Sequence, residues 1–247
     1  MPSAPAAAAD WTSSLDPMKP GPHPKIRALE ADYRLSWKGM IDAGKVTMSF
    51  DGLKGTARAW GGSQGMAARL FPYDFDYKGS FRPDALTPLR FVAWEKDKKD
   101  ATTFTVNWRG DRAVSREDIR PHSVDAVFHR DHQFEFTPMF DLFTGMLHVR
   151  SQKLAVGETH RFVIFPQTGG YLVDTKVIGR EAMHGKPAIR MELGMRKIGD
   201  DLNLQSYDKL KKATLWLADD SDRLLLELRA KVFIGDVRMS LTGARTK

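Results

Sequence analysis

Hydrophobic and polar residues alternate along most of the chain from Leu29 onward, which predicts β-strands with one buried face. The clearest run lies near the C-terminal end, where every second residue from Leu224 to Ile234 is apolar and Glu227, Arg229 and Lys231 lie on the opposite face. Similar alternation marks Tyr33/Leu35/Trp37, Val46/Met48/Phe50, Phe104/Val106/Trp108, Ile189/Met191/Leu193/Met195 and Val237/Met239/Leu241. Most links between these runs are short and rich in turn residues, so consecutive strands are expected to pair antiparallel.

Two stretches depart from this pattern and predict helices. Residues 65–71 follow a glycine-rich turn and precede Pro72, which ends a helix. In the stretch from Thr137 to Val149, we expect Thr137 to cap the helix and Pro138 to occupy its first turn. Apolar residues then recur at helical spacing, at Met139, Leu142, Phe143, Met146 and Leu147.

The apolar stripe of this second helix needs a sheet to pack against. The predicted fold is therefore mainly β: a large curved, mostly antiparallel sheet, open or a half barrel, with one or two short helices packed on the concave side. Strands do not alternate with long helices, and no repeat of fixed length is evident, so a doubly wound fold or a TIM barrel is not expected.

The first residues differ in composition from the rest of the chain. Residues 1–25 are rich in alanine and proline, which is typical of a flexible leader or linker, and residues 26–247 are expected to form a single β-rich domain. The leader lacks the basic start and apolar core of a secretory signal, and we interpret it as the start of a mature exported chain whose signal has been replaced by a methionine. No apolar run approaches the roughly 20 residues of a transmembrane helix.

Charge and cysteine content narrow the possible partners. The net charge of the 247 residues is +7, but basic residues alternate with acidic ones, as in the segment 95–100, and form no block of about five like charges. This distribution is typical of a diffuse basic surface without a specific partner and argues against nucleic acid. Anionic envelope ligands, such as lipid headgroups or acidic glycans, are the alternative. Because cysteine is absent, disulfides, thiolate metal sites and a lipid-modified cysteine are excluded.

Several short motifs occur in a fixed order between Leu29 and Leu241. They are Tyr33–Trp37 with Ala43–Gly44, Leu86–Arg90, Asp141–Phe143 with Val149–Arg150, Leu154–Glu158, Gly179–Glu181 with Gly185–Ala188, and Leu215–Asp220 with Lys231–Gly235. Together they resemble the bacterial family known as domain of unknown function 3108. The resemblance implies an exported, envelope-associated protein and supplies no catalytic residue. By looser analogy, the chain is similar to periplasmic lipoprotein carriers, whose curved sheets hold acyl chains beneath a helix.

One motif suggests catalysis. Residues 61–65 match the pattern G-x-S-x-G of a nucleophile elbow, with Ser63 in the nucleophile position. Such an elbow lifts its serine at the end of a parallel sheet, whereas the strands predicted here are antiparallel. We therefore interpret this segment as a loop and expect no catalytic residue.

Two clusters suggest metal binding. His129 and His132 lie three residues apart, which does not match the H-E-x-x-H motif, so we expect no metal ligand or cofactor there, even with His122 nearby. The second cluster holds Asp219 and Asp220, with a further aspartate two residues on, but it lacks a complete calcium loop. Hydrogen bonds from backbone amides to these carboxylates in a hairpin turn explain it better.

The candidate ligand-binding residues are Arg150, Phe143, Met146, Trp216 and Arg90. Arg150 ends the predicted helix, where its charge suits the helix C-terminus but is also placed to bind a phosphate or carboxylate at the rim of the concavity. Arg90 is a weaker candidate of the same kind. Trp216 lies on the strand face opposite Leu215 and Leu217, so both faces are apolar there, and one of them either packs against a helix or encloses a ligand.

Three functional hypotheses follow from these observations. The first is a non-enzymatic periplasmic protein that holds a lipid, lipoprotein or hydrophobic glycan conjugate between the sheet and the helix. The second is a hydrolase of envelope polymers that uses Ser63 or Asp141. The third is an assembly module that presents a sheet edge to a protein partner.

Overall fold

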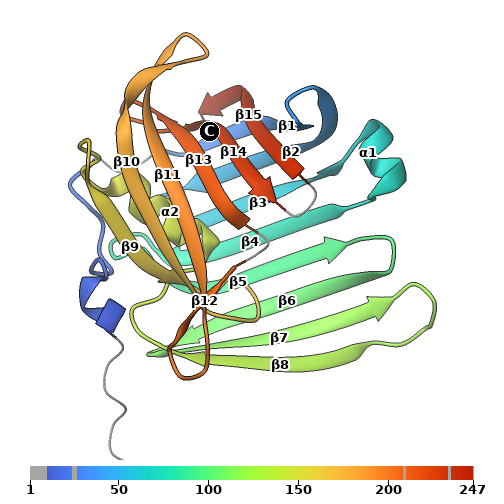
Figure 1. The fold of residues 1–247 in the computed structure, drawn as a ribbon. Coiled ribbons are helices and arrows are strands. Elements are labelled where there is room, and N and C mark those ends of the chain that lie inside the picture. Colours follow the sequence, from blue (N-terminus) through green and yellow to red (C-terminus); the bar gives the residue numbers. More distant parts are fainter. Residues whose placement is uncertain (1–9, 24–26, 208–209, 233–234, 247) are drawn as a thin grey trace, which may run out of the picture.

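A computed structural model of the chain describes residues 10–23, 27–207, 210–232 and 235–246 (Figure 1). The first half contains η1 (Asp10–Ser14), β1 (Leu29–Trp37), β2 (Ile41–Asp51), β3 (Thr56–Ser63), α1 (Gly65–Leu70), β4 (Asp74–Arg82), β5 (Thr87–Lys96), β6 (Asp100–Arg109) and β7 (Arg112–Pro121). The second half contains β8 (Phe128–Glu135), α2 (Leu142–Ser151), β9 (Thr159–Ile164), β10 (Tyr171–Met183), β11 (Lys186–Ile198), β12 (Leu204–Ser206), β13 (Leu210–Ala218), β14 (Leu225–Val232) and β15 (Gly235–Thr246).

All strands of the described residues belong to one sheet, which confirms the predicted fold class. Strands β1 to β8 follow one another as an antiparallel meander, and on the other side of β1 the order continues with β15, β14, β13, β11, β10 and β9. The short β12 pairs with β11. No ladder joins the two end strands, β8 and β9, in the part of the chain that the structure describes, so the sheet stays open.

The sheet curves around α2, which lies on its concave side (Figure 1). Phe143 anchors this helix: its ring contacts the rings of Phe50 on β2, at a centroid distance of 6.1 Å, and Phe91 on β5, at 5.7 Å. Gly79 of β4 leaves room for this ring, because a Cβ atom there would lie 2.7 Å from Cδ2 of Phe143. The helix therefore closes over the sheet through an aromatic contact that depends on a glycine.

The start of α2 differs from the prediction of a helix from Thr137 to Val149. The helix begins at Leu142, and the N-cap is Asp141 rather than Thr137. The carboxylate of Asp141 accepts hydrogen bonds from the backbone N–H groups of Phe143 and Thr144, at 2.7 and 2.8 Å, and Thr144 Oγ1 accepts one from the backbone N–H of Asp141. This reciprocal capping box gives hydrogen-bond partners to backbone N–H groups in the first turn of α2, which have no carbonyl partner within the helix.

The short helix expected over residues 65–71 is present as α1 (Gly65–Leu70). It lies in the connection between β3 and β4, and none of its residues is buried. Of the two α-helices in the described residues, α2 alone packs on the concave side.

A β-bulge changes the predicted inner face of β14. Trp216 of β13 pairs with Glu227 and Leu217 pairs with Leu225, so Leu226 has no partner in the register. Leu226 consequently packs on the outer face with Trp216, whereas Leu225 and Leu228 face the concavity. The prediction that alternate residues from Leu224 share one face is wrong at the bulge, because the extra residue shifts the alternation.

Part of the predicted linker packs against the domain. Trp11 of η1 stacks on Phe136 at a centroid distance of 5.4 Å, and its indole N–H donates a hydrogen bond to the backbone oxygen of Leu202 at 3.0 Å. Farther along, the backbone N–H of Gly21 donates to Ser151 Oγ at 2.9 Å. Residues 10–23 are thus part of the packed structure, while residues 1–9 and 24–26 lie outside the described residues.

Candidate functional site

A cavity of about 450 Å³ lies between α2 and the concave face of the sheet. Strands β1 to β4, β9 to β11 and β13 to β15 line it, together with α2. The lining side chains are aliphatic, aromatic or methionine, with four polar exceptions: Tyr33, Tyr77, Arg150 and Thr175. Protein interiors are normally close-packed, so this apolar space is the candidate functional site of the molecule.

Arg150 places a positive charge in the wall of this cavity. It belongs to the last turn of α2 and is 3% exposed. One terminal N–H donates to the backbone oxygen of Asp222 at 2.6 Å, and the guanidinium carbon lies 5.3 Å from the ring centroid of Phe50. Burial lowers the pKa of Arg150 to about 10, although the nearby Tyr33 and Asp222 act to raise it.

Tyr33 of β1 is the second polar residue in this part of the wall. It is 3% exposed, and its burial raises the pKa of the phenol to about 12, while the charge of Arg150 acts in the opposite direction. Tyr33 and Arg150 both line the cavity.

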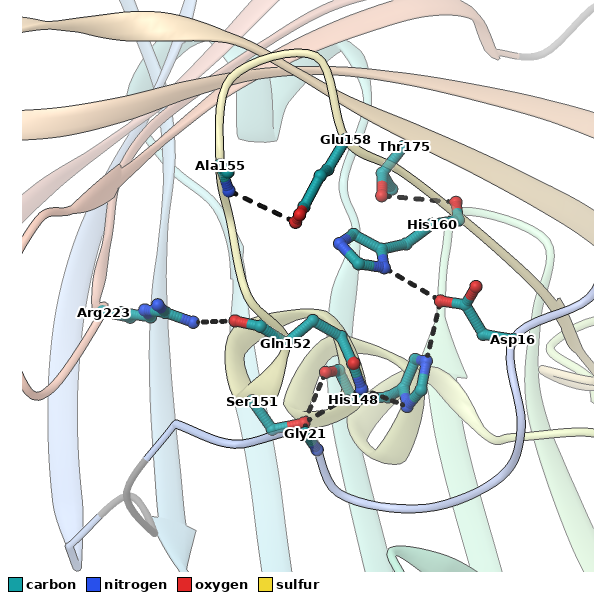
Figure 2. A network of polar contacts seen from close by, with 10 residues as sticks. All are labelled: Asp16, Gly21, His148, Ser151, Gln152, Ala155, Glu158, His160, Thr175 and Arg223. Atoms are coloured by element: carbon teal, nitrogen blue, oxygen red, sulfur yellow. Dashed lines mark hydrogen bonds and ion pairs between the residues drawn. The ribbon is translucent and has the colours of Figure 1, made fainter.

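The N-terminal segment helps to hold α2 in place through a partly buried polar network (Figure 2). The Asp16 carboxylate accepts hydrogen bonds from His148 Nε2 of α2, at 3.3 Å, and from His160 Nδ1 of β9, at 3.0 Å. Burial acts to raise the pKa of Asp16, but the hydrogen bonds from both imidazoles hold it well below its usual range. Asp16 therefore joins the helix to the edge strand β9.

The C-terminal end of α2 is fastened from another direction. Arg223, in the turn before β14, donates hydrogen bonds to the backbone oxygens of Arg150, at 2.7 Å, and Gln152. These oxygens belong to the end of the helix, where carbonyl groups have no intrahelical partner. The guanidinium of Arg223 thus gives these carbonyl oxygens hydrogen-bond donors, and its positive charge complements the helix dipole.

The structure brings three of the five predicted ligand-binding residues together. Phe143, Met146 and Arg150 all line the cavity. Trp216 does not: it packs on the outer face of the sheet, where its indole N–H donates to Glu181 at 2.6 Å. Arg90 is exposed on β5 and also lies outside the cavity lining.

Sequence reasoning missed Tyr33 as a candidate, although its alternation with Leu35 predicted a strand. The only signal was a hydroxyl group on a face expected to be buried. Thr175 and Tyr77 carried the same weak signal, and nothing in the local sequence showed that their strands meet around one space.

The motifs that suggested other chemistry have structural roles. Ser63 lies at the end of β3, in an antiparallel part of the sheet, and its Oγ accepts a hydrogen bond from the backbone N–H of Tyr73 at 2.9 Å. His129 contacts Asp118 at 2.6 Å and His132 contacts Glu117 at 2.9 Å. Among the described residues, no group of three or more His, Cys, Asp or Glu side chains is arranged to hold a metal ion.

The aspartate cluster forms the turn that its sequence indicated. Asp220 Oδ1 accepts hydrogen bonds from the backbone N–H groups of Asp222 and Arg223, both at 2.9 Å. The carboxylate of Asp222 in turn binds the guanidinium of Arg27.

Within the described residues, no helix is long and apolar enough to cross a membrane.

The chain matches several solved structures at low sequence identity. A crystal structure of a beta-barrel-like protein of domain of unknown function DUF1849 from Brucella abortus has a TM-score of 0.57 and 11% identity, and the match covers 91% of this chain and 99% of that chain. The Mycobacterium tuberculosis lipoprotein LppX has a TM-score of 0.24 and 11% identity, with coverage of 88% of this chain and 85% of that chain. The first match indicates a shared fold and carries no information about function.

No curated protein matches the chain. The sequence pattern of one family, described as "Protein of unknown function (DUF3108)", matches residues 32–242. This range includes most of β1, all of α2 and most of β15, and it contains every residue that lines the cavity. The resemblance expected from the ordered motifs is confirmed, and the chain belongs to the DUF3108 family.

Proposed function

We propose that this protein is a non-enzymatic component of the bacterial cell envelope that binds the hydrocarbon part of a lipid, a lipoprotein or a hydrophobic glycan conjugate. The observation that carries the proposal is the cavity of about 450 Å³ with an almost entirely apolar wall. Its volume falls in the range of about 300–1,000 Å³ that is typical of small-molecule sites. A hydrocarbon chain would gain the van der Waals contacts that the wall lacks when it is empty.

The position of α2 supports a carrier function. The helix forms one side of the cavity and packs against the rest of the core through Phe143, Leu147 and His148. A ligand that enters between helix and sheet has to displace few backbone hydrogen bonds. The periplasmic location that we propose rests on the family resemblance.

The second hypothesis, hydrolysis by Ser63 or Asp141, has less support. The Asp141 carboxylate is fully buried and accepts hydrogen bonds from the start of α2. Ser63 Oγ accepts a bond from the backbone of the β3–β4 connection and is absent from the cavity lining. Neither group is placed to attack a ligand in the cavity.

Binding of a neutral, polarity-sensitive naphthylamine dye tests the proposal. The variant Met195→Trp would fill part of the cavity from β11, and the variant Leu89→Trp would place the same side chain at an exposed site on β5. We expect dye affinity to fall at least about tenfold in Met195→Trp and to be unchanged in Leu89→Trp, with both variants folded by circular dichroism. Native mass spectrometry of the purified protein should also detect a bound acyl compound. Equal dye binding by both variants, or no binding by the unmodified protein, would contradict the proposal.

A further inference from the structure

The charge of Arg150 is placed in surroundings that do not balance it. The side chain is 97% buried, and most of its neighbours in the cavity wall are apolar. Burying an ionised group is costly unless another charge and hydrogen bonds compensate for it. The groups around this guanidinium therefore decide whether its charge is compensated within the protein.

Within the described residues, no carboxylate lies within 4.0 Å of Arg150 as an ion-pair partner. The nearest acidic residues are engaged elsewhere: the Asp222 carboxylate binds Arg27, and Asp220 Oδ1 accepts backbone hydrogen bonds. Arg150 itself donates to one backbone oxygen, that of Asp222, and contacts the ring of Phe50. Its Nε–H is buried and has no hydrogen-bond partner among the described residues.

The position of Arg150 at the helix end does not explain this arrangement. A basic residue in the last turn usually serves to complement the helix dipole and to bind its free carbonyl groups. Arg223 already fills that position, because it donates to the backbone oxygens of Arg150 and Gln152. The guanidinium of Arg150 instead lines the cavity, together with Tyr33.

We propose that the cavity binds an anionic amphiphile, and that Arg150 binds its carboxylate or phosphate group while the hydrocarbon chain lies along the apolar wall. This inference rests on the proposed function and specifies its ligand class. The free Nε–H and the terminal N–H groups form the fork that pairs with an oxyanion through two parallel hydrogen bonds. Tyr33, which lines the same cavity, offers a phenol hydroxyl as a further donor.

The test compares ligands that share one chain length and differ in the head group. Palmitate, hexadecyl phosphate and hexadecanol are titrated at a pH of about 8 by displacement of the neutral dye. A charged hydrogen-bonded group contributes about 10- to 100-fold to affinity, so we expect at least one of the two anions to bind at least about tenfold more tightly than the alcohol. Whichever anion binds more tightly identifies the head group.

Three variants connect this preference to the guanidinium. Arg150→Met should lower the affinity for the preferred anion about tenfold or more and leave the affinity for hexadecanol within about twofold. Arg150→Lys keeps the charge but not the fork, and should fall between the two. Arg90→Met, at an exposed position, removes the same charge and serves as the control.

The possible failures are distinguishable. If the unmodified protein binds the alcohol and both anions equally, the anion assignment is wrong, while hydrophobic binding stands. If the unmodified protein binds none of the probes, including the dye, the proposed function itself is wrong. The comparison of ligands on the unmodified protein does not depend on the folding of any variant.

Discussion

The carboxylate that caps α2 makes the stability of the protein depend on pH in an unusual direction. Asp141 is fully buried; its Oδ1 accepts two backbone hydrogen bonds, and its Oδ2 is buried without a partner among the described residues. Burial raises the pKa of Asp141 from 3.8 to about 6, against the opposing effect of the hydrogen bonds from Thr144 and Phe143. Protonation should therefore stabilise the folded state.

The size of this effect follows from the two pKa values. Between pH 3.8 and about 6 the folded protein binds a proton at Asp141 that the unfolded chain does not, so the stability contributed by this group falls as the pH rises. At about 1.4 kcal/mol for each pH unit, the full difference is about 3 kcal/mol. Between a pH of about 7.5 and one of about 4.5, the same linkage relation gives a gain of about 2 kcal/mol.

The variant Asp141→Asn isolates this contribution. The amide oxygen can still accept hydrogen bonds at the helix start, but the group no longer titrates. Urea unfolding of both proteins at several pH values measures the difference in free energy of unfolding, in which the effects of other carboxyl groups cancel. We expect this difference to change by about 2 kcal/mol in favour of the unmodified protein as the pH falls from about 7.5 to about 4.5. A difference that stays constant over this range would refute the reasoning.

Two further predictions concern the attachment of α2. Gly79→Ala should lower the free energy of unfolding in the urea assay by about 1–3 kcal/mol, because the new Cβ would lie 2.7 Å from the Phe143 ring. The control is Gly194→Ala on β11, where a Cβ would meet open space, so this variant should be neutral or slightly stabilising. Asp16→Asn should cost about 1–3 kcal/mol and speed amide hydrogen exchange in Leu142–Ser151, since it weakens the bonds to His148 and His160; unchanged exchange there would argue against a fastening role.

The general fold was predictable because burial on one side of a strand leaves a period-two pattern. Runs such as Val46/Met48/Phe50 and Ile189/Met191 identify strands without knowledge of their partners. The bulge opposite Trp216 was not predictable, because Leu224, Leu225 and Leu226 are all apolar and allow either phase of alternation. The helix start was misplaced because Thr137 and Pro138 have suitable types for a cap, and only the hydrogen bonds of Asp141 select the true one.

The part of the candidate site that lies on α2 was predictable from the sequence. Phe143, Met146 and Arg150 share a helix, and helical spacing alone places them on neighbouring positions. Tyr33 and Thr175 come from strands far apart in the chain, and their meeting depends on the curvature of the whole sheet. Trp216 was expected near a ligand because both faces of its strand are apolar, but the outer face packs against Met183 and Leu226 instead.

The open sheet has a consequence for the range of molecules that can fit inside. In a closed barrel, strand number and stagger fix the girth, and widening it means breaking a ladder of backbone hydrogen bonds. Here the seam between β8 and β9 is bridged by side chains such as the stacked rings of Phe134 and Phe165, 5.8 Å apart. Because no ladder of backbone hydrogen bonds joins β8 to β9 in the described residues, strand pairing does not fix the girth of the sheet at this seam.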